Sequence, residues 1–148
     1  GPGFKNPEAL AGWQEMLGKA AARMEERGLA GYLEGRRAQA EILGRNPDSD
    51  AALAAREGTL TSTVAGLRRF ALGVAGPVPN LVDSLHRIEA PTLVLVGEHD
   101  AAFQRAGEVM AAKLPHATHR VIEDAGHVIN LDRPEAFCEA VVAFLGSV

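Results

Sequence analysis

The chain has 148 residues, of which 47% are hydrophobic and 23% charged, and its formal net charge is −4 with a pI near 5.7. This length allows one domain, or a lid and a partial domain, with a buried core. The acidic balance argues against nucleic acid or an anionic membrane as a partner, and no apolar run approaches the roughly 20 residues of a membrane span.

Cysteine usage and the chain start bear on the compartment. The single cysteine, Cys138, excludes an internal disulfide and fits a reducing compartment, so we expect a cytoplasmic protein. The opening residues lack the basic and apolar regions of a signal peptide. Gly1-Pro2 is either native or the remnant of a protease cleavage site. The 15 basic residues are dispersed, with Arg36-Arg37 and Arg68-Arg69 as the only doublets.

Helical patterns fill the first half of the chain, where no strand signal is found. Asn6-Pro7 is typical of a helix start, and apolar residues then recur at three- and four-residue steps until Gly28. Further helices are predicted over residues 29–45, 48–57, 60–74 and 80–88. We therefore predict that residues 1–88 form a helical cap or lid region.

The second half alternates strand and helix. Thr92 to Val96 is a continuous apolar run rich in β-branched residues, as expected for a strand buried on both faces of a parallel sheet. A helix over residues 102–113 and a second strand from His119 to Glu123 follow. Asp132 and Glu135 have the spacing of a capping box at the start of a last helix, whose buried face lies at or beside Cys138.

The predicted fold class is α/β, with residues 89–148 as a strand-helix-strand-helix lobe whose crossover is parallel and right-handed. Two parallel strands alone do not make a stable sheet in water. The helical first half supplies no further strand. We expect the sheet to be completed by a missing N-terminal part of a larger protein or by a second copy of the chain.

Asp100 and His127 are the candidate catalytic residues. Each follows one of the two predicted strands, and functional groups of open α/β sheets lie beyond the carboxyl ends of the strands. A carboxylate bonded to one imidazole nitrogen fixes the tautomer and leaves the other nitrogen free to take a proton. Gly126 would allow a tight turn before His127. Asp100 alone could equally be a helix N-cap, and Glu98, His99 and Asp124 are interpreted as solvated loop residues.

At this point the chain resembles the α/β-hydrolase family. The resemblance rests on APTLVLVGEHD, residues 90–100, on IEDAGHVINLDRPEAFCEAVVAFL, residues 122–145, and on the Gly97 to Asp100, Gly126-His127 and Pro134-Glu135 motifs within them. It implies that Asp100 is the triad acid and His127 the general base. It also implies that the helical half is the cap that such enzymes insert after the sixth strand. The opening GPGF is similar to the segment that leaves that strand in some members, which favours a native Gly1-Pro2.

One expected part is absent. The family's nucleophile lies in a G-x-S-x-G elbow upstream of the acid and the histidine. None of the serines of this chain, Ser49, Ser62, Ser84 and Ser147, lies in such an elbow. The oxyanion-hole loop is missing as well. Serine, cysteine and aspartate all remain open as the missing nucleophile, and some members of the family carry the acid after the sixth strand instead.

Three aromatic residues are candidates for binding the substrate. Phe103, Trp13 and Phe70 are predicted to line an apolar substrate pocket beneath the cap, with Phe103 directly after the acid loop. His116, His119 and Asp124 lack the thiolate or HExxH pattern of a zinc site, so we expect no metal. No glycine-rich loop follows a strand, so we expect no cofactor.

The predicted function is that of the cap and C-terminal part of a hydrolase that cleaves an ester, lactone, amide or similar carbonyl substrate. Without its nucleophile the chain alone should be inactive. The alternative is a non-catalytic binding or assembly module, a homo-oligomer that completes its sheet with another copy. A third possibility is a subunit whose nucleophile comes from a separate polypeptide.

Overall fold

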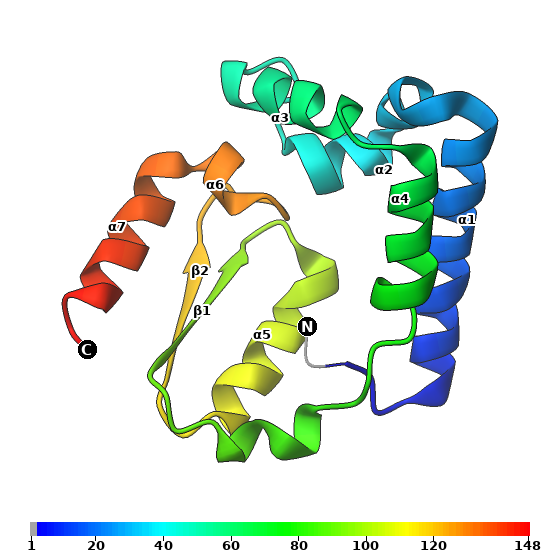
Figure 1. Cartoon of the computed structure of the whole chain (residues 1–148). Helices are drawn as coiled ribbons and strands as arrows, with labels where there is room; N and C mark the ends of the chain where they lie inside the picture. Colours follow the sequence, from blue (N-terminus) through cyan, green and yellow to red (C-terminus); the bar gives the residue numbers. More distant parts are fainter. Residues whose placement is uncertain (1–2) are drawn as a thin grey trace.

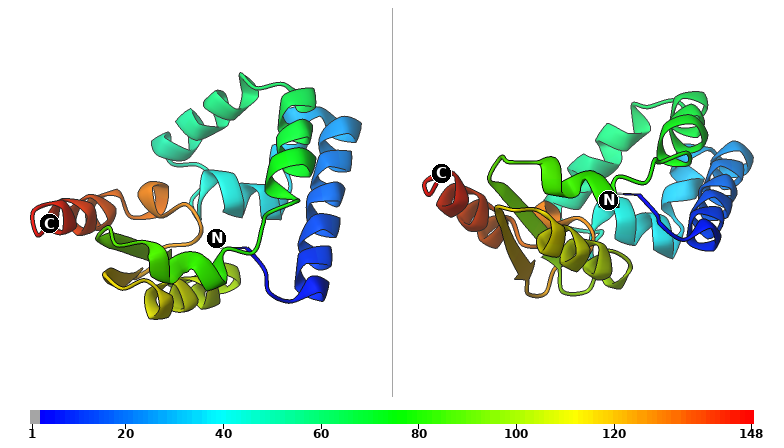
Figure 2. Two further views of the ribbon diagram at one scale, coloured as in Figure 1. Left: turned by 60° about the horizontal axis from the view of Figure 1, so that its bottom comes forward. Right: turned by 90° about the horizontal axis from the view of Figure 1, so that it is seen from below.

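The computed structural model describes residues 3–148, so the origin of Gly1-Pro2 lies outside the described residues. Figure 1 shows helices over residues 3–88, followed by a part with two strands, in the order that the sequence predicts. We refer to these two parts as the cap and the lobe, as labels only. Helices α1 and α4 stand side by side at one end of the molecule, and α7 lies at the other end (Figures 1 and 2). No helix in the described part of the chain has the length and apolar character needed to cross a bilayer.

Helix α1 (Pro7–Leu33) begins where the sequence predicts. The Asn6 side chain accepts the Glu8 N–H at 2.8 Å, and Pro7 occupies the first helical position. As predicted, the first helical segment ends at Gly28, where φ 65° and ψ 176° form a sharp kink, and a second helical segment begins directly after it. The kink redirects the chain towards the lobe.

The predicted helix over residues 29–45 is divided. After the end of α1, Gly35 adopts an extended conformation, and only α2 (Arg36–Ala38) and the π-helical turn η1 (Gln39–Leu43) follow it. Gly44 then takes φ 82°, a conformation that side chains disfavour, and the helix ends there. Gly35 and Gly44 therefore interrupt the predicted helix, whereas Gly31 lies inside α1.

The remaining cap helices follow the predicted order with shifted bounds. They are α3 (Asp50–Leu60), α4 (Val64–Phe70), the π-helical turn η2 (Ala71–Ala75) and the 3₁₀ helix η3 (Val82–Arg87). Ser49 caps α3 through the Ala52 N–H, and Thr63 caps α4 through the Gly66 N–H. The predicted 60–74 helix is interrupted at the Thr63 cap, so its single apolar stripe is divided among α3, α4 and η2.

The lobe contains a parallel pair of strands. Strand β1 (Thr92–Gly97) pairs with β2 (Ala117–Ile122) in a register that joins Thr92 to Ala117 and Gly97 to Ile122. Helix α5 (Ala101–Lys113) connects them, and α6 (Ile129–Asp132) and α7 (Pro134–Leu145) complete the lobe. Within residues 3–148 the sheet has these two strands only. The carboxyl ends of both strands therefore lie at one edge, directed towards the cap.

Helices cover both faces of this sheet. On one face Val94 and Val96 pack with Leu114 near the end of α5, and on the other Ile122 packs with Ala140 of α7. Burial on both sides explains why β1 reads as an unbroken apolar run. Cys138 is exposed on α7, so the prediction that it lies in or beside the core is wrong.

Candidate active site

The loops that follow the two strands are held together by main-chain contacts. The His99 N–H donates to the Ala125 oxygen at 2.8 Å. A Cβ at Gly97 would overlap the main-chain oxygens of Ala125 and Gly126, so only glycine fits at the end of β1. In the loop where the sequence suggests a tight turn at Gly126, the residue with a positive φ is Asp124, at 55°. These contacts fix the relative positions of the residues that the loops carry.

Asp100 and His127 meet at this edge. His127 Nδ1 lies 2.8 Å from Asp100 Oδ2, and the Asp100 side chain is only 12% exposed whereas that of His127 is 39% exposed. Because an ionised carboxylate can only accept, the imidazole donates through Nδ1–H. Its Nε2 then carries a lone pair that can take a proton. The prediction that the strand ends bring these two residues together is confirmed by their geometry.

Asp100 occupies the N-cap position of α5 but does not use its carboxylate there. Its main-chain oxygen accepts the N–H groups of Phe103 at 2.9 Å and Gln104 at 3.1 Å. Its side chain turns to the imidazole of His127 instead. Asp100 is therefore the N-cap residue of α5 by position, as the alternative states, but its carboxylate bonds to His127 and not to the helix.

An aromatic row leads away from His127. The Phe103 ring lies 4.8 Å from the imidazole between ring centroids, and Trp13 of α1 meets Phe103 edge-on at 6.4 Å. The Trp13 indole N–H donates to the Ala75 oxygen at 2.7 Å, which fixes its orientation. These rings, with Phe4, line a pocket of about 310 Å³ that also reaches Asp100 and His127. We call it the aromatic pocket.

Phe70 is not part of this arrangement. It is the last residue of α4 and is 56% exposed. Phe70 is not among the described residues that line the aromatic pocket. The structure brings Trp13 and Phe103 to the candidate site and leaves Phe70 on the surface of the cap.

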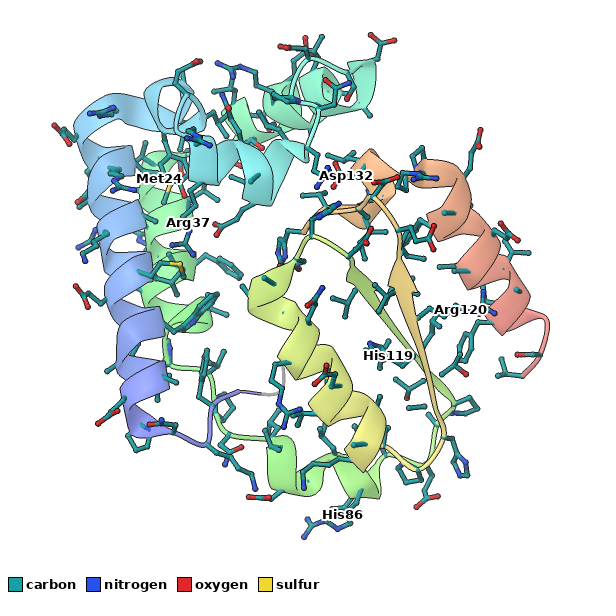
Figure 3. The ribbon with its side chains drawn as sticks, turned by 180° about the vertical axis from the view of Figure 1, so that it is seen from behind. Met24, Arg37, His86, His119, Arg120 and Asp132 are labelled. Carbon is teal, nitrogen blue, oxygen red and sulfur yellow. The ribbon has the colours of Figure 1, made fainter. Side chains whose placement is uncertain are left out.

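Asp132 is a site residue that the sequence interpretation missed. It accepts the Gly126 N–H at 2.7 Å through one oxygen and the Arg45 N–H at 2.6 Å through the other. It therefore joins the cap to the loop that carries His127, and Figure 3 shows it between the two parts. A Cβ at Gly44 would overlap its carboxylate, so the approach depends on glycine.

The predicted capping box is accordingly wrong. Arg133, not Asp132, occupies the N-cap position of α7, and Asp132 closes the preceding short helix α6. The Asp132 carboxylate is drawn away by two main-chain donors that sequence spacing does not reveal. No residue type at these partners could have signalled the contact, since a main-chain N–H is present at every position except proline.

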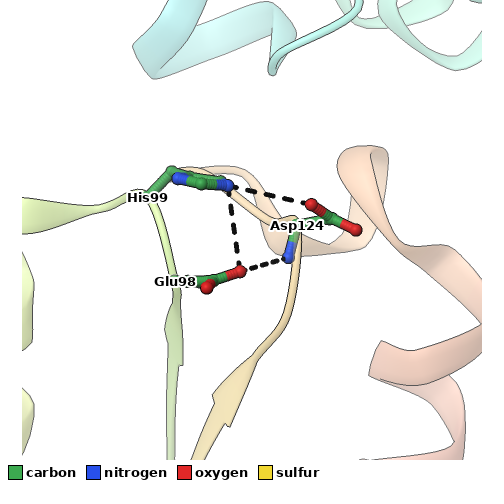
Figure 4. A group of neighbouring side chains, drawn as sticks. All are labelled: Glu98, His99 and Asp124. Atoms are coloured by element: carbon green, nitrogen blue, oxygen red, sulfur yellow. Dashed lines mark hydrogen bonds and ion pairs between the residues drawn. The ribbon is translucent and has the colours of Figure 1, made fainter.

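Glu98, His99 and Asp124 lie beside the site and are exposed, as interpreted (Figure 4). Glu98 accepts the Asp124 N–H at 2.9 Å, and His99 Nε2 lies 3.8 Å from Glu98 and 3.9 Å from Asp124. His116 and His119 do not join Asp124; His116 lies 3.7 Å from Glu89, and His119 lies beneath α5, close to Gly107. The cluster ties the two loops together at their outer side.

The serines lie elsewhere. Ser49 caps α3, Ser62 precedes α4, Ser84 lies in η3 and Ser147 follows α7. Among residues 3–148, no serine, cysteine or threonine lines the aromatic pocket. The acid–base pair therefore faces a pocket to which the described residues contribute no hydroxyl or thiol.

Comparisons with known proteins place this geometry in context. A model of the alpha/beta hydrolase family matches residues 2–140. A putative 2-succinyl-6-hydroxy-2,4-cyclohexadiene-1-carboxylate synthase of Bacillus subtilis is 29% identical over 94 residues, which are 63% of this chain and 34% of that protein. The carboxylesterase YbfK of the same organism is 33% identical over 63 residues, 41% of this chain and 21% of that protein.

A solved structure extends the similarity to nearly the whole chain. A thermophilic esterase from Thermogutta terrifontis superposes with a TM-score of 0.76 at 26% identity and covers 99% of this chain. This chain spans 53% of that esterase and about a third or less of the two Bacillus relatives.

Proposed function

Since the chain belongs to the alpha/beta hydrolase family, we propose that it supplies the acid–base half of a hydrolase active site. His127 is the general base and Asp100 the acid that orients it. The observation that carries this proposal is the 2.8 Å contact between His127 Nδ1 and Asp100 Oδ2, which leaves Nε2 free beside the aromatic pocket.

The proposed chemistry follows from this tautomer. His127 Nε2 takes the proton of a nucleophile as it attacks the carbonyl carbon of the substrate, and the cation that forms is stabilised by the Asp100 carboxylate. His127 then returns the proton to the leaving group. In the second half of the reaction Nε2 takes a proton from water as the water oxygen attacks the acyl carbon. The bond from the acyl carbon to the nucleophile then breaks, and His127 returns the proton to the nucleophile. The near-buried Asp100 carboxylate keeps the imidazole in one orientation throughout.

The substrate in this proposal is an ester, lactone, amide or similar carbonyl compound. The relatives named as esterases support the ester class. The aromatic pocket, with Phe4, Trp13 and Phe103 in its wall, suits an apolar acyl or ring group next to the carbonyl.

The nucleophile and the oxyanion hole are proposed to come from residues outside this sequence. The share of the relatives that the chain spans supports this division, as does the position of the serines away from the pocket. The chain alone is then expected to be inactive, because the group that His127 would activate is absent.

The test is hydrolysis of p-nitrophenyl butyrate by the intact protein and by the 148-residue chain. We expect turnover by the intact protein, loss of several orders of magnitude in His127→Ala, and no turnover by the chain. Labelling of the intact protein by a fluorophosphonate, at a residue outside this sequence, would identify the nucleophile as a serine. Turnover by the chain alone would contradict the proposed division, and near-normal turnover by His127→Ala would contradict the role of the histidine.

The assembly alternative is supported by one observation. Within the described residues the sheet has two strands, and each has one edge without a partner strand. Such edges favour pairing with another chain. A homo-oligomer of the intact protein that persists on dilution and hydrolyses no ester would favour this alternative.

A further inference from the structure

A second pocket adjoins the aromatic pocket on the cap side. It has a volume of about 400 Å³ and lies between α1 and the segment that contains α2 and η1. Met16, Leu17, Arg37 and Glu41 line both pockets, so the two share a wall. The two pockets are therefore neighbours, with these four side chains between them.

The side chains of this second pocket are strongly cationic. Five basic residues and one acidic residue line it, in a chain whose formal net charge is −4: Lys19, Arg23, Arg27, Arg36, Arg37 and Glu41. We call it the basic pocket. The basic residues, which look dispersed in the sequence, are gathered here by the fold.

The chain path explains the gathering. Lys19, Arg23 and Arg27 are spaced by four residues on α1, so they lie on one face of the helix. The kink at Gly28 then turns the chain back, and α2 presents Arg36 to the same space. Figure 3 labels Arg37 on this side of the cap.

Like charges at four-residue spacing destabilise a helix by about 0.2–0.5 kcal/mol per pair. Of these cations, Lys19 is paired with Glu15 at 2.6 Å and Arg37 with Glu41 at 2.7 Å. Within residues 3–148, Arg23, Arg27 and Arg36 take part in no ion pair. Their charge is therefore available to a ligand rather than used within the cap.

Tyr32 adds a neutral donor to the same wall. The residue is half-buried, and burial raises the pKa of its phenol, with the Glu41 carboxylate adding to the effect. The hydroxyl thus stays protonated at neutral pH and can donate a hydrogen bond to an anion.

We propose that the basic pocket binds an anionic group of the substrate, a carboxylate or a phosphate, on the part of the molecule remote from the reacting carbonyl. This inference rests on the proposed function, because it assigns the second pocket to the substrate of His127. Arginine suits the task, since its guanidinium can bind a carboxylate or phosphate with two parallel hydrogen bonds. The substrate class is then an ester, lactone or amide with an anionic tail.

The test compares charged and neutral substrates of the intact protein. One series consists of p-nitrophenyl monoesters of succinate, glutarate, adipate and suberate, and its neutral counterparts are p-nitrophenyl alkanoates of equal chain length. A second series places the carboxylate on the alcohol side, as in p-carboxyphenyl butyrate against phenyl butyrate. We expect kcat/KM for at least one charged ester to exceed that of its neutral counterpart by about tenfold.

The variant R23Q/R27Q/R36Q should lower this charged-to-neutral ratio about tenfold. The matched control is R69Q/R87Q/R120Q, which removes the same charge from exposed positions outside the basic pocket and should leave the ratio in place. The proposal would be overturned if the wild type hydrolysed charged and neutral esters with equal kcat/KM. It would also be overturned if both variants lowered the charged-to-neutral ratio of kcat/KM by the same factor. Absence of all ester hydrolysis would instead count against the proposed function.

Calorimetric titration tests the pocket without any turnover. Glutarate and inorganic phosphate are titrated separately into the intact protein. Binding of either anion that is weakened about tenfold in R23Q/R27Q/R36Q, and not in R69Q/R87Q/R120Q, supports the proposal. The tighter of the two identifies the preferred anion. No binding of either anion at millimolar concentration overturns the proposal even if esters are hydrolysed.

Discussion

Replacing Asp132 with asparagine should loosen the junction between the cap and the histidine loop. The change conserves size but leaves one oxygen to accept where two now accept, from Gly126 and Arg45. The amide nitrogen must then face a main-chain N–H, and because both groups are donors they form no hydrogen bond. Whichever way the amide is turned, one of the two main-chain donors loses its partner.

The cost can be estimated from burial. Gly126 is buried, so its unpaired N–H would cost about 1–3 kcal/mol, whereas the N–H of the exposed Arg45 can turn to water at lower cost. With the loss of the charged acceptor, we expect the free energy of unfolding to fall by about 2–3 kcal/mol. The assay uses the intact protein, which is longer than this chain, so we expect a Tm lower by roughly 4–6 °C.

The assay is thermal and urea unfolding of the intact protein, together with amide hydrogen exchange at Gly126, which should accelerate in Asp132→Asn. The control is Glu135→Gln. If Asp132 and Glu135 formed a capping box, the two substitutions would lower the stability by similar amounts. Because Arg133 and not Asp132 is the N-cap of α7, we expect Glu135→Gln to lower the free energy of unfolding by about 0.5 kcal/mol or less. An Asp132→Asn protein as stable as the wild type, or a Glu135→Gln protein equally destabilised, would refute this account.

Four further predictions concern the site. His127→Ala should lower kcat of the intact protein by several orders of magnitude, with KM little changed, in steady-state ester hydrolysis. Asp100→Asn should lower kcat by about three orders of magnitude or more, and unchanged turnover would assign the acid role to another residue. Gly97→Ala should lower the free energy of unfolding by about 1–3 kcal/mol in urea, because its Cβ meets main-chain atoms that cannot move aside. Phe103→Ala should raise KM for apolar esters, while Phe70→Ala, a change at an exposed ring, should leave KM unaltered; the reverse result would mean that the pocket is assigned to the wrong face.

The parts of the fold that the sequence predicts well are those where one physical cause dominates. The run from Thr92 to Val96 is apolar on both sides because helices cover both faces of β1, and no helix pattern competes with it. Parallel strands end at one edge, so the sequence alone predicts that Asp100 and His127 lie together, in agreement with their 2.8 Å contact. The start of α1 is predicted equally well, because the N-cap Asn6 bonds to a main-chain N–H only two residues further along the chain.

The features that sequence reasoning missed depend on contacts between distant segments. Asp132 has the spacing of a cap, but its partners are main-chain groups at Arg45 and Gly126. Cys138 lies next to apolar positions of α7 and is nonetheless exposed. The α7 residues that pack with Ile122 of the sheet are Ala136 and Ala140. The basic pocket is invisible as a sequence run, since it forms only when the kink at Gly28 folds two separated segments together.

The bond between Asp132 and Arg45 has a consequence for how caps and lobes can be recombined. It uses the main-chain N–H of residue 45 and the left-handed Gly44 before it, and no feature of the arginine side chain. Any foreign helical segment that presents a glycine followed by a free main-chain N–H at this point could dock on the same carboxylate. Chimeras joined on either side of this contact should therefore retain the histidine loop geometry while exchanging those walls of the two pockets that the cap contributes. Substrate range could then be altered by transplanting whole segments rather than by single substitutions.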